Sequence, residues 1–303
     1  MGPTASGKTR VAVELVQQHP FEIISVDSAQ IYRGMDIGTG KPDRATLEKA
    51  PHHLIDILDP AESYSAAAFR RDALVAMAEI TARGRIPLLV GGTMLYFKAL
   101  RDGLAAMPEA DQSIREAILQ LAANKGWNAV HQRLQEVDPD TAQRLLPTDT
   151  QRLQRALEVY EISGRPLSSF HQDPSSEAAL PYSLAQLAIM PPQRAVLHQL
   201  IAARFGNMLS QGFIEEVKTL HRRGDLNPAM PAIRCVGYRQ IWEYLEGHHD
   251  YDTMQAKALA ATRQLAKRQL TWLRSWPDLT VMDSSDSRIV EKIVKTTQTA
   301  CNY

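Results

Sequence analysis

The stretch Gly2–Thr9 reads GPTASGKT and matches the pattern Gly-x-x-x-x-Gly-Lys-Ser/Thr. Glycines in such a loop let the backbone curl until successive N–H groups point inward, and the helix that follows adds its positive N-terminal end. Lys8 brings a positive charge to the phosphates, and the Thr9 hydroxyl can bind Mg²⁺. The motif therefore predicts a site for a phosphorylated ligand, formed by Gly2, Thr4, Ala5, Ser6, Gly7, Lys8 and Thr9.

Short apolar runs alternate with helical segments around this loop. The runs 21–28, 85–92 and 182–190 are typical of buried strands, whereas residues 9–18 and 65–83 have helical character. We expect an α/β fold in which a parallel sheet of the P-loop NTPase type is flanked by helices. A strand normally precedes such a loop, yet only Met1 precedes Gly2, so we expect a short apolar segment to be missing before Met1.

Helical periodicity with charged faces replaces this alternation from Asp111 onward. The sequence predicts a small helical insertion domain at 111–179, and its Pro- and Ser-rich segment 165–180 is expected to be a loop. The catalytic domain then consists of residues 1–110 and 180–303, and it ends in helices.

Composition limits the classes to which the chain can belong. Of 303 residues, 44% are hydrophobic and 22% are charged, which is ordinary for a globular protein. No apolar run approaches the roughly 20 residues of a membrane-spanning helix, and no secretory signal is present. We therefore expect a cytoplasmic protein without a membrane partner, and a monomer is the default expectation. Two cysteines are too few for a disulfide framework or a four-thiolate zinc site.

Charge is balanced overall, with 34 Lys and Arg against 34 Asp and Glu, so any nucleic-acid contact must be local. Residues 255–276 contain five basic residues and no acidic one. In a helix, Arg263, Lys267 and Arg274 would lie along one side. This side is either a solvated helix face or a contact for a nucleic-acid backbone.

Further motifs follow the phosphate loop along the chain. They are VDSAQIYRGMDIGTGKP (26–42), HHLID (52–56), VGGTMLY (90–96), QRLQRALEV (151–159), RCVGYRQ (234–240) and AKRQLTWLR (266–274). Together with GPTASGKT, and in this order, they resemble the tRNA dimethylallyltransferase family over nearly the whole chain. The C-terminus lacks the Cys and His zinc finger of eukaryotic relatives, so the chain resembles a bacterial member.

The resemblance implies a reaction. In this family the N6 amine of the adenosine on the 3′ side of the tRNA anticodon attacks the first carbon of dimethylallyl diphosphate, and diphosphate leaves. The phosphate loop, Arg204 and Mg²⁺ bound by Thr9 would hold the leaving group. The adenine amine is a poor nucleophile and must lose a proton, and Asp27, at the end of a predicted strand, matches the family's general base. The residues alone leave open that Asp27 is instead a Mg²⁺ ligand.

The resemblance also implies contacts with RNA, and the anticodon stem-loop is the expected partner. The catalytic residues it implies are Asp27, Thr93 and Lys8. Positions that match the family's tRNA contacts are Asp27, Ser28, Ala29, Gln30, Thr93, Arg115, Gln151, Arg152, Leu153, Gln154, Arg155, Arg234, Cys235, Val236, Gly237, Tyr238 and Arg239. Turn or helix capping is an alternative role for Ser28 and Gln30, a helix N-cap is one for Thr93, and a surface position on a helix is one for Arg204.

Two other classes of protein use the same loop. A small-molecule kinase would bind ATP there, transfer its γ-phosphoryl group and carry an Arg-rich lid. An RNA-binding ATPase without covalent chemistry would need a water-positioning residue and switch loops, for which the sequence has no clear signal. Transfer of a prenyl label to tRNA in the absence of ATP would distinguish a dimethylallyltransferase from the kinase and from the RNA-binding ATPase.

Overall fold

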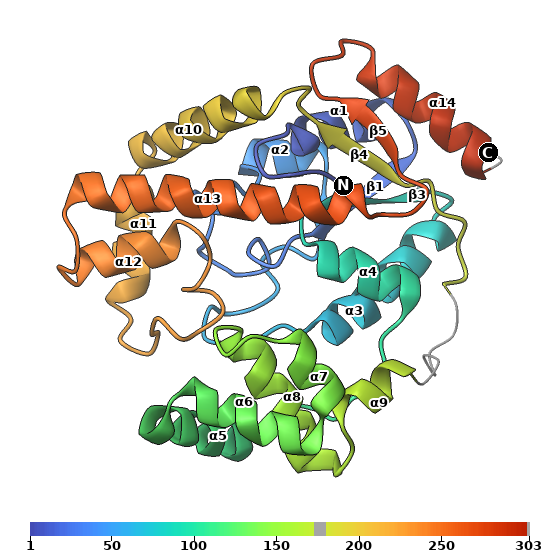
Figure 1. Ribbon diagram of the computed structural model, residues 1–303. Coiled ribbons are helices and arrows are strands. Elements are labelled where there is room, and N and C mark those ends of the chain that lie inside the picture. Colours follow the sequence, from blue (N-terminus) through green and yellow to red (C-terminus); the bar gives the residue numbers. More distant parts are fainter. Residues whose placement is uncertain (173–179, 302–303) are drawn as a thin grey trace. The chain divides into compact units, whose positions relative to one another are not determined.

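The computed structural model describes residues 1–172 and 180–301. Contacts within the chain divide it into two compact units (Figure 1). One unit, residues 1–100 and 181–303, contains the strands, and the other, residues 101–180, is helical. We call them the sheet unit and the helical unit. Among the described residues, no helix has the combination of length and apolar character that crossing a bilayer requires.

Parallel strands form the centre of the sheet unit. β1 (Phe21–Val26) lies between β2 (His52–His53) and β3 (Ile86–Gly91), and β4 (Leu187–Met190) pairs with β5 (Thr280–Asp283). The apolar runs correctly predicted β1, β3 and β4, although each strand is shorter than its run. β2 and β5 were not predicted, because such short strands carry little periodicity. The α/β fold class is confirmed.

Residue 1 lies beside β4. The Met1 amino group donates to the Leu187 carbonyl at 2.7 Å, and the Met1 carbonyl accepts the Ile189 N–H at 2.9 Å. At the next residue, Gly2, an added Cβ would lie 2.4 Å from the Ile189 carbonyl oxygen. Only glycine therefore allows the chain to pass β4 this closely and enter the phosphate loop.

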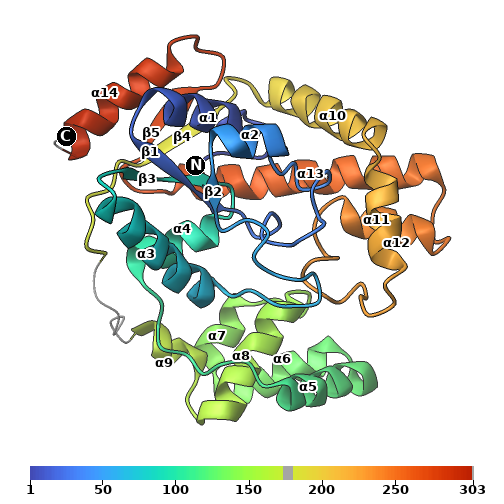
Figure 2. The same ribbon diagram turned by 180° about the vertical axis from the view of Figure 1, so that it is seen from behind.

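Helices cover the sheet and complete its core (Figure 2). α1 (Lys8–Gln18) packs against β1 and β3 and also against α14 (Ile289–Cys301). α3 (Ala66–Ala82) packs against the same two strands, while the shorter α2 (Arg44–Lys49) contacts α1. α4 (Met94–Asp102) begins shortly after β3. Every residue of β1 except Glu22 is buried, as in a strand covered on both faces.

A second core of the sheet unit lies among its later helices. These are α10 (Arg194–Ser210), α11 (Phe213–His221), α12 (Tyr238–Leu245) and α13 (Tyr251–Arg274). Buried residues of α11 to α13 pack against Ile31, Tyr32 and Met35, which belong to the segment after β1. This packing fixes that segment beside the carboxyl end of the central strand.

The helical unit has its own small core. Its helices are α5 (Gln112–Lys125), α6 (Trp127–Val137), α7 (Pro139–Arg144), α8 (Thr150–Ser163) and α9 (Leu167–Gln172). Buried side chains of α5 to α8 form one apolar cluster. The loop predicted at 165–180 was wrong for α9, where buried Asp138 accepts the Ser168 N–H at 3.0 Å. The rest of that predicted loop includes residues 173–179, which lie outside the described part of the chain.

Candidate active site

A cavity of about 570 Å³ lies at the carboxyl ends of β1 and β3, where ligands of open parallel sheets gather. The cavity is lined by the phosphate loop, the segments after β1 and β3, α10, α13, Pro231 and residues 234–238. Predicted site residues in this lining are Thr4, Ala5, Lys8, Thr9, Asp27, Ser28, Ala29, Gln30, Thr93, Arg204, Arg234, Cys235, Val236, Gly237 and Tyr238. The cavity thus combines a phosphate loop with a carboxylate and several polar side chains.

The phosphate loop ends where α1 begins. Gly7 has a φ of 81°, in the left-handed region that favours glycine, and the next residue, Lys8, is the first of the helix. The Lys8 ammonium donates to the Pro3 carbonyl within the loop at 2.6 Å. Gly2, Ser6 and Gly7 do not line the cavity, and the buried Ser6 hydroxyl has no hydrogen-bond partner among the described residues.

Lys8 and Arg204 are two of the positive side chains that line the cavity. Burial lowers the pKa of Lys8 to about 8; the charge of Arg204 adds to this lowering, and Asp27 opposes it. The pKa of Arg204 is also lowered, because the guanidinium is removed from water. Neither cation has a carboxylate within ion-pair distance among the described residues, and Arg204 instead donates to the Thr39 carbonyl at 3.1 Å. Such an arrangement favours a bound anion.

Asp27 follows β1 and presents one free oxygen. Its Oδ1 accepts the N–H groups of Ala29 at 2.9 Å and Gln30 at 3.4 Å, which fixes the carboxylate in a turn. Oδ2 makes no hydrogen bond with any described residue, so it can accept a proton or bind a cation. Asp27 therefore stabilises the turn through Oδ1 and still has Oδ2 available for chemistry.

Thr93 joins the segments that follow the two central strands. Its hydroxyl accepts the Ser28 N–H at 3.0 Å and donates to the Ser28 hydroxyl at 3.3 Å. The Gln30 amide is held on both sides, because it accepts from the Ser25 hydroxyl at 3.1 Å and donates to the Gly40 carbonyl at 3.3 Å. These two sets of bonds hold Ser28, Thr93 and Gln30 in place beside Asp27.

Comparison with known proteins gives the family. The family model described as IPP transferase matches residues 30–276, most of the chain. The chain belongs to this family. A tRNA dimethylallyltransferase of Thioalkalivibrio sulfidiphilus is 63% identical over 283 residues, which are 93% of this chain and 88% of the relative. The family resemblance drawn from the motifs is thus confirmed.

Solved structures of the family agree with the fold. A tRNA isopentenylpyrophosphate transferase from Bacillus halodurans is 36% identical with a TM-score of 0.69, over 97% of this chain and 91% of that chain. A eukaryotic dimethylallyltransferase described as acting on tRNA is 24% identical with a TM-score of 0.76, over 99% of this chain and 75% of that chain. At this lower identity the second likeness supports the fold alone.

The family motif at 234–240 contributes both exposed and buried residues. Arg234 is exposed and lines the cavity, whereas Arg239 is exposed but pairs with Glu243 at 2.9 Å. The Tyr238 side chain is buried and its hydroxyl donates to Glu216 at 2.5 Å, so an RNA contact at this position stays a prediction. Burial raises the pKa of Cys235 to about 12, so this thiol stays neutral.

The predicted RNA contacts of the helical unit differ in exposure. Gln151 and Arg152 are exposed and Gln154 is partly buried. The Leu153 side chain is buried in the core of the unit, and an RNA contact at this position stays a prediction. Arg115 and Arg155 both already bind the carboxylate of buried Glu158, at 2.8 Å each. Their exposed fractions, 40% and 33%, leave part of each guanidinium open to solvent.

Three residues that support the site were not predicted from the sequence. Gln269 of α13 accepts the Thr4 N–H at 2.8 Å and donates to the Gly92 carbonyl at 2.9 Å, so it joins the phosphate loop to the turn after β3. Lys41 and Glu216 hold the segment after β1. Lys41 and Gln269 lie inside quoted family motifs, and that position was the one signal that could have identified them.

The cavity has oxygen donors suited to Mg²⁺. Thr9 and Asp27 both line it, and neither the Thr9 hydroxyl nor Asp27 Oδ2 bonds to a described residue. Mg²⁺ usually keeps several waters and binds one or two carboxylates together with substrate phosphates. No cluster of three or more His, Cys, Asp or Glu in the described part of the chain could hold a metal alone. The residues present therefore fit Mg²⁺ that binds together with a diphosphate.

Proposed function

We propose that this chain transfers a dimethylallyl group from dimethylallyl diphosphate to N6 of the adenosine on the 3′ side of a tRNA anticodon, with release of diphosphate. The observation that carries the proposal is the cavity in which Lys8 and Arg204 lie near Asp27, both partly buried and without an ion-paired carboxylate among the described residues. The names of the similar proteins support the same substrates.

The proposed reaction is a displacement at the first carbon of the prenyl group. The bond from this carbon to the diphosphate oxygen breaks and leaves its electron pair on the diphosphate, while the N6 lone pair forms the new C–N bond. Asp27 Oδ2 takes the proton that N6 loses. Lys8, Arg204 and the phosphate loop stabilise the negative charge that grows on the leaving group. Mg²⁺, held by Thr9 and the diphosphate, would neutralise part of that charge.

The proposal assigns the RNA side to both units of the chain. The anticodon stem-loop binds the exposed Arg234 and the basic side of α13, and the helical domain predicted at 111–179 binds it through Arg152, Arg115 and Arg155. Arginine side chains suit phosphates and unstacked bases of single-stranded loops. In the same proposal a single copy of the chain works in the cytoplasm.

A transfer assay tests the function directly. Unmodified tRNA is incubated with dimethylallyl diphosphate labelled in the prenyl group, with Mg²⁺ and without ATP. We expect label in the RNA. The matched control is the same tRNA with guanosine in place of the target adenosine, which lacks the N6 amine and should stay unlabelled. Transfer that requires ATP, label that enters only from γ-labelled ATP, or equal label in the control would reject the proposal.

A further inference from the structure

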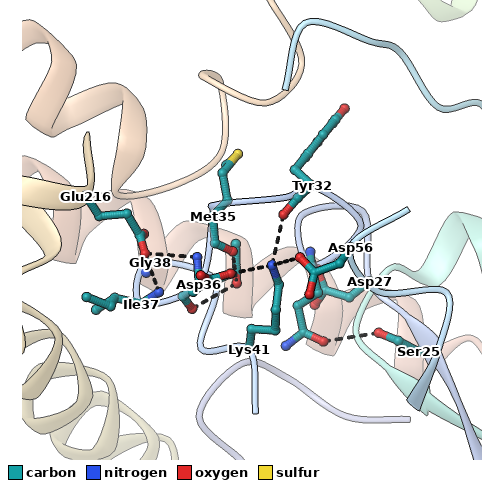
Figure 3. Close-up of polar contacts among 12 residues, drawn as sticks. Ser25, Asp27, Tyr32, Met35, Asp36, Ile37, Gly38, Lys41, Asp56 and Glu216 are labelled. Carbon is teal, nitrogen blue, oxygen red and sulfur yellow. Dashed lines mark hydrogen bonds and ion pairs between the residues drawn. The ribbon is translucent and has the colours of Figure 1, made fainter. Parts of the chain in front are cut away.

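Glu216, on the first turn of α11, gathers hydrogen bonds from the segment after β1 (Figure 3). Its Oε2 accepts the N–H groups of Asp36 at 2.9 Å and Ile37 at 2.7 Å, and its Oε1 accepts the Gly38 N–H at 3.1 Å. The Tyr238 hydroxyl also donates to Oε1, at 2.5 Å. One carboxylate thus fixes three consecutive backbone groups, and bonds of this kind to a charged acceptor are the stronger ones.

The segment held by Glu216, residues 36–40, forms a turn whose two glycines lie against side chains of neighbouring helices. A Cβ added to Gly38 would lie 2.0 Å from the Phe213 ring of α11, and one added to Gly40 would lie 2.1 Å from the Arg204 guanidinium of α10. The backbone of this turn therefore lies directly against the helix side chains. A shift of this turn should therefore also displace the Arg204 guanidinium.

Two carbonyls of the same turn orient residues of the cavity. The Thr39 carbonyl accepts from Arg204 at 3.1 Å, and the Gly40 carbonyl accepts from the Gln30 amide at 3.3 Å. Arg204 is a cavity cation without a carboxylate partner among the described residues, and Gln30 follows Asp27 in the turn after β1. The turn thus connects Glu216, which does not line the cavity, to two residues that do.

Lys41 fixes the other end of the turn (Figure 3). Its side chain is only 3% exposed, and its ammonium donates to the Tyr32 carbonyl at 2.9 Å and to the carboxylates of Asp36 and Asp56 at 2.5 Å each. Because this end is held independently, loss of the Glu216 bonds should loosen the turn locally rather than release the whole segment.

We propose that Glu216 is a positioning residue for prenyl transfer, which acts through the turn 36–40 to hold Arg204 in the orientation that binds the diphosphate. The inference rests on the proposed function and extends it to a residue outside the cavity. Removal of the carboxylate should weaken diphosphate binding more than it slows the chemical step, because Asp27 is held by its own backbone bonds.

The test compares Glu216→Gln with Glu215→Gln. Glu215 is the adjacent residue, is 67% exposed and pairs only with Lys218 among the described residues, so its variant is a matched control. We expect Glu216→Gln to raise the Kd for inorganic pyrophosphate and the KM for dimethylallyl diphosphate by about tenfold, with a smaller change in kcat. The control should leave all three unchanged.

Coupling to Arg204 separates positioning from a merely structural role. In a double-mutant cycle with Arg204→Lys, the loss of pyrophosphate affinity from Glu216→Gln should shrink to less than about threefold, because the guanidinium that the turn orients is gone. Equal losses with and without Arg204, or a lowered melting temperature with unchanged Kd, would overturn the inference. Pyrophosphate binding needs no RNA and is measured separately from prenyl transfer. The role of Glu216 can therefore be rejected while prenyl transfer is observed, and a failure of prenyl transfer can be recognised while the effect of Glu216 on pyrophosphate binding is observed.

A second variant with a shorter carboxylate side chain can be used if Glu216→Gln does not fold. Glu216→Asp keeps the charge and withdraws it from the turn, and it should raise the same Kd in the same direction. Failure of both variants to fold would assign Glu216 to the fold alone and would also overturn the inference.

Discussion

The two units of the chain treat their positive side chains in opposite ways. In the helical unit, Arg115 and Arg155 bind the buried carboxylate of Glu158. In the sheet unit, Lys8 and Arg204 share a cavity with no carboxylate partner among the described residues. A paired charge stabilises the fold, whereas a buried cation without a partner lowers its free energy when an anion arrives. The comparison predicts that the diphosphate binds in the sheet unit and that Glu158 serves stability.

Asp27→Asn is expected to have the largest effect, because it removes the proton acceptor that shares the cavity with Lys8 and Arg204. Single-turnover prenyl transfer should slow by ~10²–10⁴, the usual contribution of general base catalysis. Pyrophosphate and tRNA binding should be retained, since the amide oxygen can still accept the backbone N–H groups. Arg115→Ala, from the helical unit, should leave the single-turnover rate at saturating tRNA unchanged. A loss of pyrophosphate affinity as large as the loss of rate would show Asp27 to be a metal ligand.

Lys8→Met should produce the next largest effect. Loss of a charge-assisted bond to the diphosphate should weaken pyrophosphate binding by about 10- to 100-fold in titration calorimetry. Lys218→Met, which removes an exposed lysine paired with Glu215, is the control and should bind normally. Binding of tRNA by the Lys8 variant should be close to that of the unaltered chain. A normal pyrophosphate affinity in Lys8→Met would contradict the assignment of diphosphate binding to the unpaired cations of the sheet unit.

Glu158→Gln should affect the helical unit only. Breaking a buried ion pair costs several kcal/mol, and because Arg115 and Arg155 are partly exposed and can rehydrate, we expect about 2 kcal/mol. Amide hydrogen exchange in α5 and α8 should become faster, while pyrophosphate affinity stays the same. A parallel loss of pyrophosphate affinity would contradict the separation of roles between the two units.

The smallest effect is a proton taken up on binding. At pH 8, close to its pKa of about 8, half of the Lys8 side chains in the empty cavity are neutral. A bound anion favours the charged form and raises this pKa, so about half a proton should be absorbed per pyrophosphate at pH 8 and little below pH 7. Affinity should therefore fall as the pH rises above 8. Calorimetry in buffers of different ionisation enthalpy measures the number of protons taken up on binding. After the protons taken up by pyrophosphate itself are subtracted, the remaining uptake should be absent in Lys8→Met.

Local patterns made much of the sheet unit predictable. The phosphate loop is a contiguous motif, and Asp27 and Thr93 each follow an apolar run, so the position of each in the cavity could be inferred from a few neighbouring residues. Motif membership did not reveal which way each side chain faces. Leu153 and Tyr238 lie in family motifs but face the interior of their units.

Contacts between distant residues could not be predicted from sequence patterns. Glu216 binds backbone groups 178 to 180 residues away, and nothing near it marks this partner. The Pro- and Ser-rich segment was expected to be irregular, yet Asp138, 30 residues earlier, accepts a backbone N–H near the start of α9. Both cases depend on a carboxylate supplied by another part of the fold, which local propensity does not encode.

The bond from Gln269 to the Thr4 N–H has a practical consequence for anyone who wishes to transplant or shorten this protein. The loop that looks self-sufficient in the first nine residues is completed by an amide 265 positions later. A fragment cut before α13 would therefore keep every letter of the motif and lose one of its anchors. For this protein, a fragment that keeps this anchor has to extend at least to Gln269, near the end of α13.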